Sequence, residues 1–278
     1  MDIEIIEMAD RKAKFVLKNS SPAMANALRR TLLSDIPKMA IDTVEFYTGK
    51  IEGDDGREYE SVTPLFEEII AHRMGMLPVP TDLDLFVPQS ECSCGGEGCP
   101  SCSIMYSLNK TGPCTVLSGD LMPLGNPDLK VKDEFIPIVE LTDGQAVLIY
   151  AHAVMGTAKK HVKWQVANGV GYKYMPKVKI DAKHAADSAL LEIAAKYPSA
   201  LEVSGGKVSV KSDVECGIIK GCLEDLSDAE GVEIEWQDDA FIFQFETDGS
   251  LTAQQTLDKA KEILVDEAQE FKDQIRNL

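Results

Sequence analysis

Apolar and charged residues alternate at the beginning of the chain, over residues 3–5 and again over residues 13–17. A period of two predicts strands, and the short polar segment between them predicts an antiparallel hairpin. A helix is expected next, because Ser21 suits the N-cap and Pro22 suits the first helical position, where a missing N–H costs nothing. Apolar residues then recur at helical spacing until Pro37 ends the helix.

The next part of the chain predicts strands, one helix and loops. Residues 39–47 have the pattern of a strand, whereas residues 49–60 are polar and rich in Gly and Asp, which predicts a loop. A second helix is expected over residues 63–76. Residues 80–115 have no clear period and are expected to be irregular, and residues 131–156 predict further strands.

Short strand patterns alternate with short helical patterns over residues 163–236. Strands are expected at Lys177–Ile180 and Lys207–Val210, and helices at Ala185–Lys196 and Gly217–Leu226. This alternation predicts a compact module inserted into the chain.

The last part of the chain has the strongest pattern. Residues 232–236 and 241–245 alternate and predict strands on either side of a turn at Asp238–Asp239. Thr252 and Gln255 then have the spacing of a capping box. The helix that follows is expected to have about 24 residues and a length of about 36 Å.

Apolar residues of this last helix recur every seven positions. They are Leu257, Leu264, Phe271 and Leu278, with Ala260, Ala268 and Ile275 on the same face. Such a face packs either on the helix's own domain, as in most amphipathic helices, or against a helix of another chain. The heptad spacing and the length favour a partner helix, because a helix at a chain end has little of its own domain left to cover it.

Charge narrows the possible functions. The formal net charge is −18 and the sequence pI is about 4.6. Because nucleic-acid binding draws its affinity from Lys and Arg, tight binding to DNA or RNA by this chain alone is not expected. The N-terminus has no signal-peptide pattern, and no run of about 18 apolar residues predicts a membrane span. The expected compartment is the cytoplasm.

Four of the seven cysteines lie in one short segment, at Cys92, Cys94, Cys99 and Cys102. In a chain without an export signal, this spacing favours a metal site over a disulfide framework. Glycines between the cysteines let the backbone fold tightly around an ion. A metal-free reduced loop and an iron–sulfur cluster are alternatives. A structural zinc ion is favoured, and four cysteine ligands would leave it no open position for water or substrate.

Two adjacent arginines, Arg29 and Arg30, lie on the first predicted helix. They form either a solvated basic edge or part of an interface, since the guanidinium group pairs well with carboxylates. No motif typical of a catalytic site is present, and the four histidines are scattered along the chain. The chain by itself is therefore not expected to be an enzyme.

The sequence resembles the alpha-like subunit of archaeal DNA-directed RNA polymerase, the counterpart of the eukaryotic third subunit and the bacterial alpha subunit, over essentially its whole length. The resemblance rests on ANALRR at 25–30, IPKMAID at 36–42, EIIAHRMGMLP at 68–78, KHVKW at 160–164 and the closing segment from residue 243. It implies an archaeal source and an α+β fold: an alpha-like dimerisation domain, with a sheet and long helices, that carries an inserted mixed α/β domain and a nested ferredoxin-like domain. The implied boundaries are 1–42 with 228–278 for dimerisation, 43–164 for the insert with the cysteine loop, and 165–227 for the ferredoxin-like domain.

The resemblance also implies a function in transcription. The chain would be a non-catalytic assembly subunit of DNA-directed RNA polymerase, a nucleotidyltransferase complex. It would pair with the small subunit L, and this heterodimer would be the platform for subunits N and P and the large catalytic subunits. The implied interface residues are Asn26, Arg29, Arg30, Leu257, Ala260, Leu264, Phe271 and Ile275.

The third domain of this family often binds iron–sulfur clusters through two C-x2-C-x2-C-x3-C runs, and this sequence departs from that pattern. Only Cys216 and Cys222 stand at the corresponding positions. The other six are Asp187, Leu190, Ile193, Tyr197, Ile219 and Leu226. Because a cluster needs four ligands, mostly thiolates, we expect a cluster-free domain with Cys216 and Cys222 as remnants.

Two other functions stay open at the level of sequence. The chain would be a ferredoxin-like iron–sulfur electron carrier if the purified protein were brown and contained iron. It would be a zinc-dependent nucleic-acid-binding module if it bound DNA tightly and with strong salt dependence. The high negative charge argues against this last function.

Overall fold

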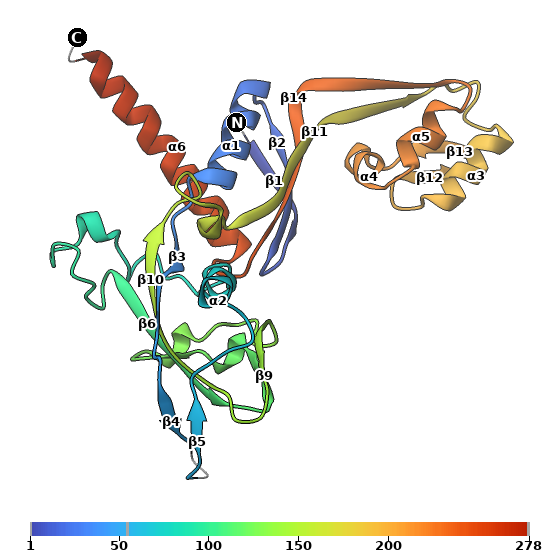
Figure 1. The fold of residues 1–278 in the computed structure, drawn as a ribbon. Coiled ribbons are helices and arrows are strands. Elements are labelled where there is room, and N and C mark those ends of the chain that lie inside the picture. The colour runs from blue at the N-terminus through green and yellow to red at the C-terminus, as the bar shows by residue number, and fades with distance from the viewer. Residues whose placement is uncertain (1, 54–55, 277–278) are drawn as a thin grey trace. The chain divides into compact units, whose positions relative to one another are not determined.

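The computed structural model describes residues 2–53 and 56–276 and has an α+β fold with antiparallel sheets (Figure 1). The chain divides into two compact units, residues 1–29 with 169–246 and residues 30–168 with 247–278. Both units are therefore built from segments that lie far apart in the sequence.

The first unit is built around a sheet with the strand order β1-β2-β14-β11. Its strands are β1 (Asp2–Met8), β2 (Lys12–Lys18), β11 (Ala167–Ile180), β12 (Leu201–Ser204), β13 (Lys207–Val210) and β14 (Val232–Thr247). Its helices are α3 (Ser188–Lys196), α4 (Asp213–Ile218) and α5 (Cys222–Ser227), with the first part of α1 (Pro22–Ser34). The predicted N-terminal hairpin is confirmed, since β1 and β2 pair antiparallel.

Alternation along β2 and β14 gives this sheet two apolar faces. On one face Phe15 lies opposite Phe243, and their rings stack with centroids 5.2 Å apart. On the other face Val16 lies opposite Ile242, and both are buried. This burial explains why the predicted period of two holds in β2 and the second half of β14.

Helix α4 packs on the second face of the sheet, where its residues Val214 and Ile218 contact the cluster of Val16, Met175, Ala240 and Ile242. The approach is close at Gly217, because a Cβ there would lie 2.7 Å from Cδ1 of Ile242. A side chain at this position would therefore push α4 away from the sheet.

The predicted module between β11 and β14 has a core of its own. Its buried residues come from β11, from the β12–β13 hairpin, from the three short helices and from the turns between them. They are Val178, Leu190, Ala194, Tyr197, Ala200, Leu201, Val208, Cys216, Cys222 and Leu226. Figure 1 shows α3, α4 and α5 grouped around β12 and β13 at the end of the long ribbon formed by β11 and β14.

The second unit is built around a sheet with the order β3-β10-β6-β8. Its strands are β3 (Lys38–Phe46), β4 (Lys50–Glu52), β5 (Glu58–Glu60), β6 (Ser103–Thr111), β7 (Cys114–Leu117), β8 (Met122–Pro123), β9 (Pro137–Leu141) and β10 (Ala146–Gly156). Its helices are α2 (Glu67–Gly75) and α6 (Ala253–Arg276), with the short 3-10 turns η1 (Gln89–Glu91), η2 (Ser118–Asp120), η3 (Pro127–Leu129) and η4 (Val162–Trp164). Ile70 and Met74 of α2 are buried in one core with Ile41 and Tyr106 of the sheet.

Two segments that we expected to be loops or irregular contain strands. Residues 49–60 include β4 and β5, because Ile51 and Tyr59 are buried in a small cluster with Ala146. Residues 80–115 include β6, which pairs with β10 over its whole length. In both segments the strand is stabilised by contacts with β10 or its start, which lies far away in the sequence.

Helix boundaries also differ from the expectation. Helix α2 begins only at Glu67, and the hydroxyl of Thr63 donates to the carbonyl of Leu65, a local turn that competes with an earlier helix start. The predicted helix Gly217–Leu226 is broken into α4 and α5 at Gly221, whose φ of 84° lies in the left-handed region. Residues 131–136 lie outside any strand, whereas β9 and β10 confirm the rest of that prediction.

The expected turn at Asp238–Asp239 is wrong, because β14 continues through it without interruption. The carbonyl of Asp239 accepts a hydrogen bond from the N–H of Ser20, at 3.0 Å, so the backbone stays engaged with the end of β2. Both aspartates are exposed, which removes the cost of placing carboxylates in a strand.

A buried ion pair in the second unit joins Lys38 of β3 to Asp248, which precedes α6. The Lys38 side chain is 3% exposed and that of Asp248 is 18% exposed. We expect Lys38→Ala to lower the free energy of unfolding by about 3–5 kcal/mol, because it leaves a largely buried carboxylate without its partner. Chemical denaturation measures this loss. The matched control is Lys50→Ala, whose pair with Glu58 is 68% exposed on both sides, and it should leave the denaturation midpoint unchanged.

Candidate metal centre and partner helix

The cysteine loop lies between the 3-10 turn η1 and the start of β6. Gly95, Gly96 and Gly98 have φ values of 70°, 89° and 86°, which only glycine adopts without strain. Backbone hydrogen bonds close tight turns within the loop, from Gly95 N–H to Cys92 C=O and from Cys102 N–H to Cys99 C=O. The glycines therefore allow the chain to reverse direction between the cysteines.

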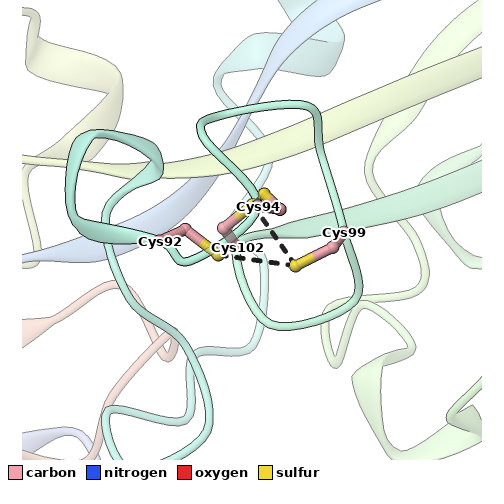
Figure 2. A group of neighbouring side chains, drawn as sticks. All are labelled: Cys92, Cys94, Cys99 and Cys102. Atoms are coloured by element: carbon pink, nitrogen blue, oxygen red, sulfur yellow. Dashed lines mark hydrogen bonds between the residues drawn. The ribbon is translucent and has the colours of Figure 1, made fainter.

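These turns bring all four sulfur atoms together, as Figure 2 shows. The Sγ–Sγ distances are 3.4 Å for Cys92–Cys99, 3.6 Å for Cys94–Cys102 and 3.9 Å for Cys99–Cys102. All four sulfurs lie within 4.8 Å of one another. A tetrahedral ion with bonds near 2.3 Å requires sulfur atoms about 3.8 Å apart, so the cluster can hold a metal ion such as zinc.

The thiols of this cluster differ in their pKa values. A hydrogen bond from the backbone N–H of Cys99 lowers the pKa of the Cys94 thiol to about 5. Burial raises the pKa of the Cys102 thiol to about 12. Four thiolates together would need a compensating cation, and a divalent metal would supply it because it binds thiols in their deprotonated form.

Within residues 2–53 and 56–276, these cysteines are the one group of three or more His, Cys, Asp or Glu side chains placed to share an ion. Cys114 lies outside the group, and its Sγ donates to the carbonyl of Thr111 at 3.3 Å. None of the helices in the described part of the chain is long and apolar enough to cross a membrane.

Helix α6 is confirmed with the predicted capping box. The N–H of Gln255 donates to the Thr252 hydroxyl at 3.2 Å, and the N–H of Thr252 donates to the Gln255 side chain at 3.0 Å. The apolar stripe is buried at the start of the helix, at Leu257 and Ala260. The first turns of α6 therefore belong to the core.

The same stripe is open to solvent further along α6. Leu264 is half-buried, whereas Phe271 is 66% exposed and Ile275 is 54% exposed. Val265, which the heptad count leaves out, is also 59% exposed. Leu278 lies outside the described residues. Monomeric proteins rarely leave such a contiguous apolar face uncovered, so this end of α6 is a candidate partner surface.

The other predicted interface residues lie on α1. Arg29 donates two hydrogen bonds to the side-chain oxygen of Asn26, at 2.8 and 3.1 Å, and its guanidinium group is thereby held along the helix. Arg30 is exposed. Asn26 thus orients Arg29, while Arg30 is open to solvent.

Three of the sequence motifs meet around one cavity of about 240 Å³ in the second unit. They contribute Asp42, His72 and Lys163, among others. The ammonium group of Lys163 contacts the carboxylate of Asp42 at 2.5 Å and the carbonyl of Ile41 at 3.1 Å. The sequence alone did not indicate that these motifs pack on one another.

The ferredoxin-like positions fill the core of the module. Cys216, Cys222, Leu190 and Leu226 are all buried there. Burial raises the pKa of Cys216 to about 12 and also raises that of Cys222. Both thiols are therefore protonated at neutral pH and shielded from reagents.

We expect native-state alkylation with iodoacetamide at pH 8 to leave Cys216 and Cys222 unmodified while Cys94 reacts in the chelator-treated protein. The thiolate is the reactive form, and the two buried thiols carry almost none of it. Peptide mass spectrometry reads out each site, with the denatured chain as the control for full modification. Fast modification of Cys216 in the native protein would contradict the buried geometry.

Comparison with known proteins adds the family. The model of the RNA polymerase Rpb3/Rpb11 dimerisation domain matches residues 14–268. The chain belongs to the Rpb3/Rpb11 family. DNA-directed RNA polymerase subunit Rpo3 of Picrophilus torridus is 45% identical over 259 residues, 93% of each chain. The subunit of the same name from Thermoplasma volcanium is 44% identical over 267 residues, 96% of each chain.

More distant Rpb3/Rpb11 relatives cover the chain equally well. Rpo3 of Pyrococcus furiosus is 34% identical over 281 residues, which span 100% of this chain and 98% of that one. The predicted resemblance to the archaeal alpha-like subunit is thereby confirmed, because these relatives are archaeal Rpo3 subunits. As a member of the Rpb3/Rpb11 family, the chain is an alpha-like RNA polymerase subunit.

Proposed function

We propose that this Rpb3/Rpb11 chain is a non-catalytic assembly subunit, which pairs with the small subunit L to form the platform for the rest of the polymerase. The observation that carries the proposal is the exposed apolar face at the end of α6, with Phe271 and Ile275 more than half exposed. Subunits N and P and the large catalytic subunits would then bind this heterodimer. Asn26, Arg29 and Arg30 on α1 would belong to the assembly surface.

The expected free energies indicate that the end of α6 cannot hold a partner chain without further contacts. Burying one large apolar side chain completely contributes about 1.5–3 kcal/mol. Association costs about 4–15 kcal/mol in lost freedom, so three such side chains do not suffice by themselves. The partner would therefore have to cover more than the tip of α6, as an obligate heterodimer does.

The cysteine loop would hold one structural zinc ion, with Cys92, Cys94, Cys99 and Cys102 as its ligands. Zinc would supply only cross-linking of the loop, because four thiolates fill its coordination shell. We also propose that the module over residues 165–227 contains no iron–sulfur cluster. Leucine and tyrosine occupy positions where a cluster needs thiolates, and they fill the core instead.

The domain division proposed for assembly follows the family: residues 1–42 with 228–278 for dimerisation, 43–164 as the insert and 165–227 as the nested module. In this arrangement both ends of the chain serve the same domain. Replacing the segment between β11 and β14, residues 181–231, by a short linker would then leave pairing with subunit L intact.

Co-expression with an archaeal subunit L tests the proposed function. A stable 1:1 complex on size-exclusion chromatography, formed at nanomolar concentration, is the expected result. Persistence of both chains as separate species would contradict it. Iron content and visible absorbance, measured on the same sample, test the electron-carrier alternative, for which a brown protein is expected.

A further inference from the structure

A second cavity, of about 210 Å³, lies on the face of the first unit's sheet that α4 covers. Polar groups of three neighbouring strands line it: Lys14 of β2, Gln244 of β14 and Lys173 of β11. Ile218, the last residue of α4, and Ile242 form its apolar side. Neither the family nor the assembly function assigns a purpose to this place.

The pleat of the sheet brings the three polar groups onto one face. Lys14 and Val16 share a face because side chains alternate along a strand, and Val16 is buried beneath α4. Gln244 lies directly opposite Lys14 in the β2–β14 register. Since β11 is the next strand, Lys173 completes a row of two ammonium groups with an amide between them.

These two lysines lack the carboxylate partners that their neighbours have. On β2, Lys12 pairs with Glu7 at 3.5 Å and Lys18 pairs with Glu4 at 2.5 Å. In the described part of the chain, no ion pair joins Lys14 or Lys173 to a carboxylate. Glu7 stands opposite Lys14 in the β1–β2 register, yet its carboxylate lies in the pair with Lys12.

Both ammonium groups have donors to spare. Lys173 donates to the carbonyl of Gly217 near the end of α4, which leaves two of its three N–H groups. Partial burial lowers the pKa of Lys173, and so does repulsion from the nearby Lys14 ammonium group. An anion between them would remove this repulsion and accept the free N–H groups.

We propose that this cavity binds a small phosphate-type oxyanion between Lys14 and Lys173, with the amide of Gln244 as a third donor. The volume is below the 300–1,000 Å³ typical of sites for drug-sized ligands, so a single phosphate group fits the space better than a whole nucleotide. The inference is independent of pairing with subunit L.

Titration of the purified full-length chain with inorganic phosphate at low ionic strength tests the site, by calorimetry and by the shift in Tm. Wild-type protein is expected to bind with saturation and to gain thermal stability. Lys14→Gln should weaken binding about tenfold or more, since it removes one charge-assisted contact. Lys18→Gln is the matched control, because it lies on the same strand and face and should leave phosphate binding unchanged.

Lys173→Gln also removes a contact to α4, so its circular dichroism and Tm without phosphate are compared with those of Lys14→Gln. Equal phosphate affinity of wild-type and Lys14→Gln protein would overturn the proposal. So would the absence of any saturable binding, which would show two lysines that are merely solvated. Acetate binding as tight as phosphate binding would also overturn it, because it would indicate a carboxylate site.

Discussion

Replacing Leu264 and Phe271 together by aspartate is expected to abolish the complex with subunit L. Each aspartate would place an unpaired charge on the face of α6 that subunit L is proposed to cover, and such a charge costs about 2–5 kcal/mol. Two of them weaken binding at least about a thousandfold. Phe271 is exposed and Leu264 is only half-buried in the chain itself, so the variant should fold normally. Size-exclusion chromatography and calorimetry with subunit L measure the loss.

A matched control lowers the net charge by the same amount at two exposed polar positions of α6. Gln269→Asp with Arg276→Gln also lowers the net charge by two, and both residues are exposed. This control should pair with subunit L as tightly as wild-type protein. If the aspartate variant kept its affinity within about tenfold while folding normally, the end of α6 would not be the interface.

Replacing Cys99 and Cys102 together by serine is expected to reduce the zinc content from about one ion per chain to none. Serine hydroxyls are not deprotonated at neutral pH and do not replace thiolates as zinc ligands. Binding to a structural zinc site is worth about 10–16 kcal/mol in small zinc domains, so loss of two ligands should be complete at ordinary zinc concentrations. Elemental analysis of the purified protein measures the stoichiometry.

Acidification should release the same ion, because protons compete with the metal for the thiolates and the metal affinity therefore falls as pH falls.

Cys114→Ser is the control for the double serine variant, since this thiol lies outside the cluster and bonds to a backbone carbonyl. Its zinc content should equal that of wild-type protein. Undiminished zinc in the Cys99→Ser, Cys102→Ser variant would place the metal elsewhere, and iron in its stead would refute the assignment to zinc.

The metal loop and the partner helix differ in how their tests can fail. The loop geometry depends on a short segment, with glycines at the required turns, so a negative result would question the ion or its site and leave the proposed pairing with subunit L untouched. The partner surface depends on a second chain. Its test therefore addresses the proposed function directly, whereas loss of zinc addresses local stability.

Local chemistry explains the parts of this protein that could be predicted from its sequence. The N-terminal hairpin, the helix that begins at Pro22 and the capping box of α6 depend on residues within a few positions of one another. The cysteine cluster belongs to the same class, since the four thiols lie close together in sequence before folding. Such features can therefore be predicted without knowing how the rest of the chain folds.

Other features depended on contacts that only the folded chain provides. Ile51 and Tyr59 form a hairpin in a polar segment because Ala146 lies against them. Asp238 and Asp239 stay in an extended strand because the neighbouring backbone is paired. Local propensity favoured a loop or a turn in each case, and burial together with strand pairing outweighed it.

The sequence by itself determined the family, most of the helix and strand types, the grouping of the four cysteines and the apolar stripe of α6, because these follow from residue spacing along the chain. The tertiary structure alone decided which part of the α6 stripe is buried and which is open, since that depends on where the core ends. It also decided that Lys14 and Lys173 face one cavity. These two residues lie far apart in the sequence, and the strand order and register of the sheet bring them together. Nonlocal packing sets both.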